Sequence, residues 1–97
     1  MTRTDDSQAG VDHAAGLLMA VGCDESTDPQ AAIYALSAAD HLRRAGARVE
    51  PVPVDDVVLA VADALRVLAS LPDDVFGETR IADAVDDAQE SYAAVGG

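Results

Sequence analysis

The sequence predicts an all-α protein, either a small four-helix bundle or a related helical array. Apolar residues recur at helical spacing in four segments, and residues that start or stop helices separate those segments. Only 3% of the residues are aromatic, so the interior must be built from Ala, Val and Leu, which favour closely spaced helices. Short connections further predict that neighbouring helices are antiparallel.

At 97 residues, the chain is long enough for one domain with a thin core. We expect a disordered tail over residues 1–9 and one helical domain over residues 10–95, because the tail has almost nothing to bury. The predicted helices cover approximately residues 10–21, 29–45, 54–71 and 78–95.

The first two helices have recognisable faces and ends. Asp28 is a good N-cap, Pro29 fits the first helical position, and Gly46 fits a C-terminal stop. On the first helix, one apolar face holds Val11, Ala14, Ala15, Leu18 and Val21, with Leu17 beside it. The expected core face of the second helix holds Ala32, Ile33, Ala35, Leu36, Ala39 and Leu42, widened by Ala31 and Ala38.

The third helix is the most apolar part of the chain, and an extended linker with two prolines, residues 48–53, precedes it. Its apolar residues cover more than half of its circumference, which exceeds what one core contact needs. Leu59 falls on the polar side, and Val67 lies on the shoulder between the two sides. We expect these two residues either to be exposed or to mark a docking site for another chain.

The last helix carries a regular apolar stripe, formed by Ile81, Ala84, Val85, Ala88, Tyr92 and Val95. Four acidic residues on the same helix, Asp83, Asp86, Asp87 and Glu90, are placed opposite this stripe by the helical period. We therefore expect these four to form a solvated surface.

The charge balance excludes several classes of function. Six basic residues, all arginine, stand against eighteen acidic residues, which gives a formal net charge of -12. Direct binding to nucleic acid or to anionic membranes is disfavoured, because both depend on Lys and Arg. An acidic surface suits a basic protein partner, and imitation of nucleic acid is an alternative use of the same surface.

Nothing in the sequence predicts a cofactor or a catalytic residue. Phosphate-binding loops and the HExxH, CxxC and GxGxxG motifs are absent. The single cysteine excludes an internal disulfide, and the acidic residues at positions 5 and 6 do not fit a signal peptide, so the cytoplasm is the expected location.

A polar stripe on the second helix is the best candidate site. It contains Tyr34, Ser37, His41 and Arg44, at spacings of three, four and three residues. An exposed helix face ordinarily has such a stripe, and among functional interpretations an interaction surface is favoured over catalysis. Ser37 and His41 could instead form a nucleophilic or acid–base pair, but the sequence identifies no third residue to orient the imidazole.

A metal site is the alternative hypothesis for the first two helices. Two Asp-His pairs, Asp12-His13 and Asp40-His41, could meet across antiparallel helices. Adjacent helical residues point about 100° apart, however, so the members of each pair do not share a face. This geometry makes a metal-binding protein or a hydrolase the less favoured alternative.

The sequence therefore predicts a small acidic helical protein-interaction or regulatory module, homodimeric, with no evident catalytic site. Its expected partners are a second copy of the chain and another protein, for which a basic surface would be complementary. The predicted partner interface comprises Leu59, Val67, Tyr34, Ser37, His41 and Arg44.

Overall fold

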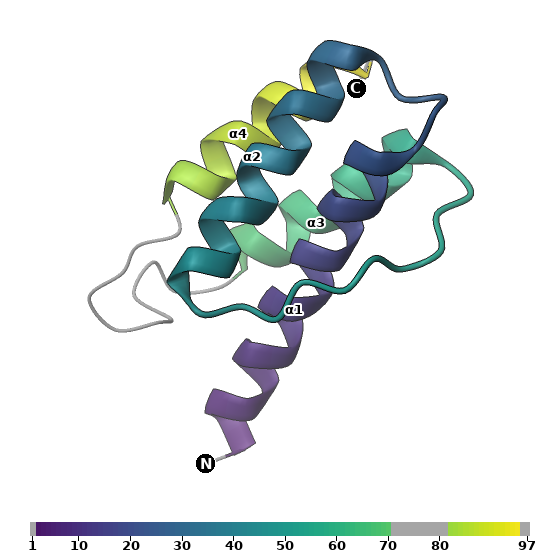
Figure 1. Cartoon of the computed structure of the whole chain (residues 1–97). Coiled ribbons are helices and arrows are strands. Elements are labelled where there is room, and N and C mark those ends of the chain that lie inside the picture. Colours follow the sequence, from purple (N-terminus) through teal and green to yellow (C-terminus); the bar gives the residue numbers. More distant parts are fainter. Residues whose placement is uncertain (1, 71–81, 96–97) are drawn as a thin grey trace.

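The computed structural model describes residues 2–70 and 82–95, which form four helices and contain no strand (Figure 1). The helices are α1 (Thr2–Cys23), α2 (Pro29–Ala45), α3 (Val57–Ala69) and α4 (Ala82–Ala94). This arrangement confirms the predicted all-α fold. Within the described ranges, none of the helices combines the length and apolarity needed to cross a bilayer.

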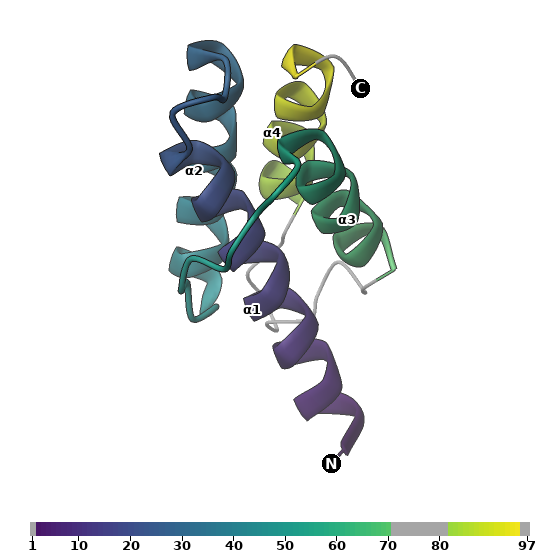
Figure 2. The same ribbon diagram turned by 90° about the vertical axis from the view of Figure 1, so that its right-hand side faces the viewer.

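The helices pack so that α1 and α4 each lie against both α2 and α3. In Figures 1 and 2, α1 and α4 run in one direction, whereas α2 and α3 run in the opposite direction. Helices that contact one another are therefore antiparallel. The prediction that helices joined by a short connection are antiparallel is wrong for α2 and α3, which are parallel, because the segment between them returns along the bundle.

This return segment, residues 46–56, crosses the outside of α1 (Figures 1 and 2). The backbone N–H of Arg48 donates a 2.8 Å hydrogen bond to Oδ1 of Asp12. One turn further along α1, Gly16 lies directly beneath the carbonyl oxygen of Glu50, and a Cβ at Gly16 would overlap with that oxygen. Gly16 thus allows the two backbones to approach closely.

Helix ends follow the local capping chemistry. The side chain of Asp28 accepts hydrogen bonds from the first turn of α2, and Gly46 ends that helix with a φ of 129°. The prediction placed the start of the third helix at residue 54, but α3 begins at Val57. The reason is Asp56, whose Oδ1 accepts from the backbone N–H groups of Val58 (3.0 Å) and Leu59 (3.2 Å).

The start of the first helix also differs from the prediction. Helix α1 begins at Thr2 rather than near residue 10, so residues 2–9 continue the helix where a disordered tail was expected. No proline or glycine interrupts residues 2–9. The carboxylates at positions 5 and 6 stabilise the helix, because negative charge near the N-terminus interacts favourably with the helix dipole. The predicted end of the third helix, at residue 71, and the predicted first residues of the last helix, 78–81, lie outside the described residues.

The core is built mainly from small and branched apolar side chains. The predicted face of α1 is buried, as is most of the alanine surface of α2. Ser91 of α4 is also fully buried, and its hydroxyl donates a 2.8 Å hydrogen bond to the carbonyl oxygen of Ala31. Helices α2 and α4 pack against each other, and both bury small side chains, which allows close approach; the buried alanines of the two helices are Ala31, Ala35, Ala38, Ala39, Ala84 and Ala88.

Candidate functional site

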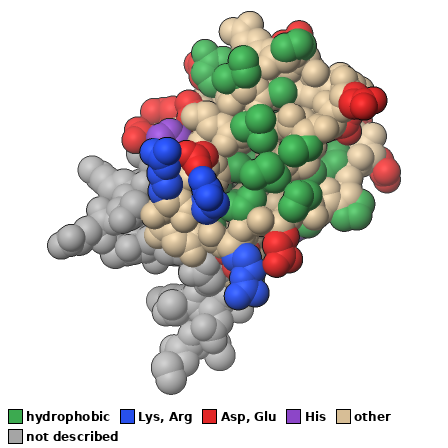
Figure 3. Space-filling model, viewed as in Figure 1, with side chains coloured by type: hydrophobic (Ala, Val, Ile, Leu, Met, Phe, Trp, Pro, Cys, Tyr) green, Lys and Arg blue, Asp and Glu red, His purple; other side chains and the backbone are tan. Residues whose placement is uncertain are grey.

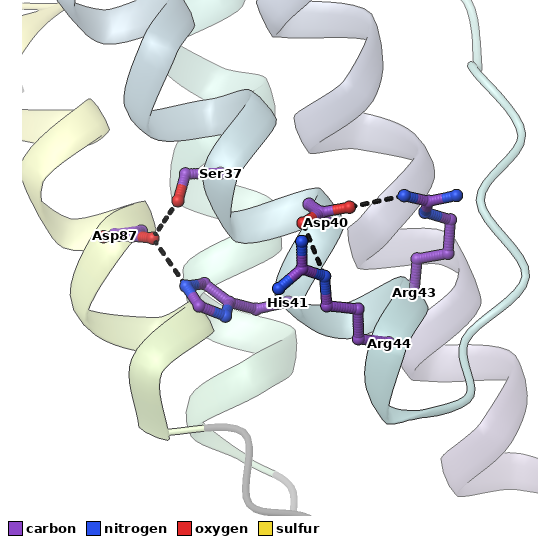
Figure 4. A network of polar contacts seen from close by, with 6 residues as sticks. All are labelled: Ser37, Asp40, His41, Arg43, Arg44 and Asp87. Carbon is purple, nitrogen blue, oxygen red and sulfur yellow. Dashed lines mark hydrogen bonds and ion pairs between the residues drawn. The ribbon is translucent and has the colours of Figure 1, made fainter.

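Two residues of the predicted polar stripe, Ser37 and His41, point from α2 toward Asp87 of α4 (Figure 4). The Ser37 hydroxyl donates a 2.6 Å hydrogen bond to Oδ2 of Asp87, and Nε2 of His41 lies 3.3 Å from the same oxygen. Asp87 is thus the partner that the sequence did not identify for this pair.

Asp87 was expected on the solvated side of α4, and this expectation is wrong. Its side chain is 23% exposed and lies at the α2 contact. The buried residues Ala84, Ala88 and Ser91 set the orientation of α4. Asp87 follows Ala84 by three residues and precedes Ser91 by four, and this spacing places it beside the buried face.

The three side chains make a clamp between two helices. In a nucleophilic site, the serine hydroxyl would hydrogen bond to the imidazole that removes its proton. Here the Ser37 hydroxyl donates to a carboxylate, and the His41 imidazole contacts that same carboxylate. The geometry therefore links α2 to α4 and does not align Ser37 with His41 for proton transfer.

Arg44, the last residue of the stripe, is part of an ion-pair cluster within α2 (Figure 4). Its Nε lies 2.9 Å from Oδ2 of Asp40, and a nitrogen of Arg43 lies 2.5 Å from Oδ1. The hydrogen bond from Arg43, together with the charges of Arg44, Arg43 and His41, lowers the pKa of Asp40 below its ordinary value.

The residues of the alternative metal hypothesis take part in separate contacts. His13 lines an open groove beside Asp12, Arg48 and Glu50, at the crossing of α1 and the return segment. His41 contacts Asp87, and Asp40 contacts the two arginines. Over residues 2–70 and 82–95, no group of three or more His, Cys, Asp or Glu side chains is arranged to hold a metal ion.

The orientation of α2 leaves two large apolar side chains in solvent. Ile33 is 67% exposed and Leu36 is 38% exposed, so the prediction that both lie in the core is wrong. The alanines determine which side of α2 is buried. When they face the core, α2 can contact α1 and α4 closely, whereas the larger side chains would hold the helices apart. Leu36 lies against Gly22 of α1, and Tyr34 is half-buried.

Ile33 and Leu36 form what we call the α2 apolar face. Their spacing of three residues places them on one side of the helix. Residues 29–39 of α2 contain no acidic or basic residue, which is unusual in a chain with a net charge of -12. Figure 3 shows hydrophobic side chains gathered over the middle and upper part of the view in which α1, α2 and the return segment lie in front.

Leu59 marks a second surface: it lies on the polar side of α3, where the sequence placed it, and is 62% exposed. Val67 is half-buried and packs against the core. A shallow, open groove of about 200 Å³ lies between the return segment and α3. We call this surface the α3 groove; its lining residues are Leu17, Pro53, Val54, Asp55, Asp56, Leu59, Ala60 and Asp63.

Comparison with known proteins finds no match to the chain among protein-family models, curated proteins or solved structures. The functional proposal therefore depends on the surfaces described above.

Proposed function

We propose that this protein is an acidic protein-interaction module that forms a homodimer through the α2 apolar face. The observation that carries this proposal is the exposure of Ile33 (67%) and Leu36 (38%) on one side of α2. Burying these two side chains against a second copy removes apolar surface from water, which is the main favourable term in protein association.

The distribution of charge supports this choice of surface. Two copies that each carry -12 repel one another, and the repulsion is weakest where a surface has no acidic side chains. Residues 29–39 of α2 meet that condition.

A symmetric pairing also brings opposite charges to the same level of the interface. A two-fold dimer uses the same patch on both copies. If two α2 helices pack antiparallel about an axis near Leu36, Asp28 of one copy lies level with Arg44 of the other, because each is eight residues from Leu36. Arg44 then extends the interface beyond the apolar centre, in keeping with its place in the polar stripe.

A cytoplasmic location fits this proposal. Cys23 is exposed, and its thiol would stay reduced in that compartment. A reducing buffer is therefore the proper condition for measuring association, because a disulfide between copies would imitate a dimer.

Sedimentation velocity in reducing buffer tests the proposal. We expect the wild-type chain to sediment as a dimer at micromolar concentration and Ile33→Asp to sediment as a monomer, because the variant places two carboxylates at the centre of the interface. Leu59→Asp is the matched control, since Leu59 has a similar exposed fraction on another helix. A monomeric wild type, or equal weakening by both variants, contradicts this interface.

Arg44→Glu provides a second test of the antiparallel pairing. The substitution places like charges at the same level at both ends of the interface, so we expect at least several-fold weaker association. Unchanged association would exclude the antiparallel arrangement. The apolar contact would still be tested by Ile33→Asp.

A further inference from the structure

We propose that the α3 groove binds a basic amphipathic helix of a partner protein. An apolar side chain of that helix sits on the groove floor, and its Lys or Arg residues pair with the carboxylates at the groove edge. The inference rests on the proposal that the protein is an interaction module, but not on its dimerisation through α2.

The floor of the groove is apolar. Leu17 and Ala60 are almost fully buried there, Val54 is half-buried, and the side chain of Leu59 stands beside them with 62% of its surface exposed. The volume of about 200 Å³ exceeds that of a cavity of roughly 150 Å³ known to admit benzene, so one large apolar side chain fits.

Three carboxylates line the edge of the same groove. Asp56 is held by α3, because its Oδ1 accepts from Val58 N–H and Leu59 N–H. Asp63 pairs with Arg66, yet 49% of its side chain remains exposed. Asp55 is exposed beside them. A rigid apolar floor between carboxylates is complementary to a helix that presents one apolar anchor flanked by cations.

The charge of the groove selects this occupant over a second copy of the chain. Two α3 grooves facing each other would bring six carboxylates into a desolvated contact, which opposes association. A basic helix neutralises the same groups, and the field of a chain with -12 net charge accelerates its approach.

A designed peptide serves as the probe. It contains leucines at helical spacing on one side and lysines elsewhere, and is about four helical turns long. A second peptide has the leucines replaced by serine, and a third has the lysines replaced by glutamate. Binding is measured by fluorescence anisotropy, and we expect the first peptide to bind about tenfold or more tightly than either of the others.

Two substitutions then locate the binding site. Leu59→Ala keeps the charge of the protein, so a loss of about tenfold in affinity is expected only if the peptide's apolar side packs there. Asp55→Asn is expected to weaken binding several-fold, whereas Asp86→Asn, which removes an equal charge from an exposed position on α4, should have a smaller effect. Both positions in the groove are exposed, so neither variant should unfold.

The inference is overturned if the serine peptide binds as tightly as the leucine peptide, because attraction would then be charge alone. It is also overturned if Leu59→Ala leaves the affinity unchanged, or if the glutamate peptide binds as well as the lysine peptide. Ile33→Asp should bind the leucine peptide with unchanged affinity. Loss of dimerisation and loss of groove binding are therefore separate results.

Discussion

Ser37 and Asp87 are 50 residues apart in the sequence, yet the Ser37 hydroxyl lies 2.6 Å from Oδ2 of Asp87 and donates to it. His41 contacts the same oxygen. Two side chains of α2 thus converge on one carboxylate of α4, at a contact whose neighbouring surface is lined largely by alanine. This polar contact can fix the register between α2 and α4, which alanine side chains alone specify weakly.

Removal of this carboxylate should destabilise the fold. We expect Asp87→Ala to lower the free energy of unfolding by about 1 kcal/mol or more, because Ser37 loses its hydrogen-bond acceptor and His41 loses its contact with the same carboxylate. Asp86→Ala, one residue earlier and exposed, should change it by less than about 0.5 kcal/mol. Urea unfolding followed by circular dichroism measures both; equal effects would show that Asp87 contributes nothing specific.

A methyl group at Gly16 should be costly. Alanine favours a helix over glycine by about 1 kcal/mol, but its Cβ would overlap with the carbonyl oxygen of Glu50. We expect Gly16→Ala to destabilise the protein by a net 1 kcal/mol or more, since overpacking typically costs about 1–3 kcal/mol. Gly22→Ala is the comparison: its Cβ would meet the side chain of Leu36, which is partly exposed and can move.

Thermal or urea unfolding of the two variants distinguishes these outcomes. Gly22→Ala should lose less stability than Gly16→Ala. A Gly16→Ala variant that is more stable than the wild type would show that the return segment does not lie on α1 as described.

The N-cap of α3, Asp56, should contribute to the stability of the protein. Asp56→Ala should destabilise the protein by about 1 kcal/mol, because the N–H groups of Val58 and Leu59 lose their acceptor. The neighbouring Asp55→Ala removes the same charge from an exposed position outside the cap and should have less effect. Chemical denaturation measures the difference; identical losses would indicate that only charge matters there.

The pKa of Asp40 predicts a response to acid. Because hydrogen bonding to Arg43 and the nearby positive charges lower this pKa in the folded state, the contribution to stability is present above the unfolded pKa. It is lost as the pH falls through the lower, folded value, below roughly pH 4. Arg43→Gln should raise the pKa of Asp40 toward its ordinary value.

Carboxyl ¹³C NMR titration measures this pKa directly. Arg66→Gln is the control. Arg66 pairs with Asp63 on α3, so its loss should leave the pKa of Asp40 unchanged. An Asp40 midpoint that does not move in Arg43→Gln would mean that the ion pair is absent in solution.

Much of the fold could be predicted because its signals are local. Asp28, Pro29 and Gly46 mark the ends of α2 through capping chemistry, and the regular spacing of apolar residues identifies the buried side of α1. The direction of α3 could not be predicted in this way. It depends on the return segment crossing α1, and Gly16, which permits that crossing, resembles a weak point of the helix when only propensity is considered.

The surfaces were harder to predict because alanine is ambiguous. On α2, apolar residues occur on both sides, and hydropathy favours burial of Ile33 and Leu36 over the neighbouring alanines. Packing distance reverses this preference, since α4 approaches closely only where side chains are small. The role of Asp87 depends on the same approach, whereas Leu59 could be placed correctly because polar residues surround it on α3.

The crossing of the return segment over α1 also determines which parts of the chain can open together. Since Arg48 N–H is held by Asp12 and Glu50 lies on Gly16, α1 cannot leave the bundle without releasing the connection between α2 and α3. The amide of Arg48, although outside any helix, should therefore exchange its hydrogen with solvent at the rate of the α1 opening rather than at the rate of an exposed loop. In the same way, cleavage by trypsin after Arg48 would report the detachment of the helix that contains Asp12, 36 residues earlier in the sequence.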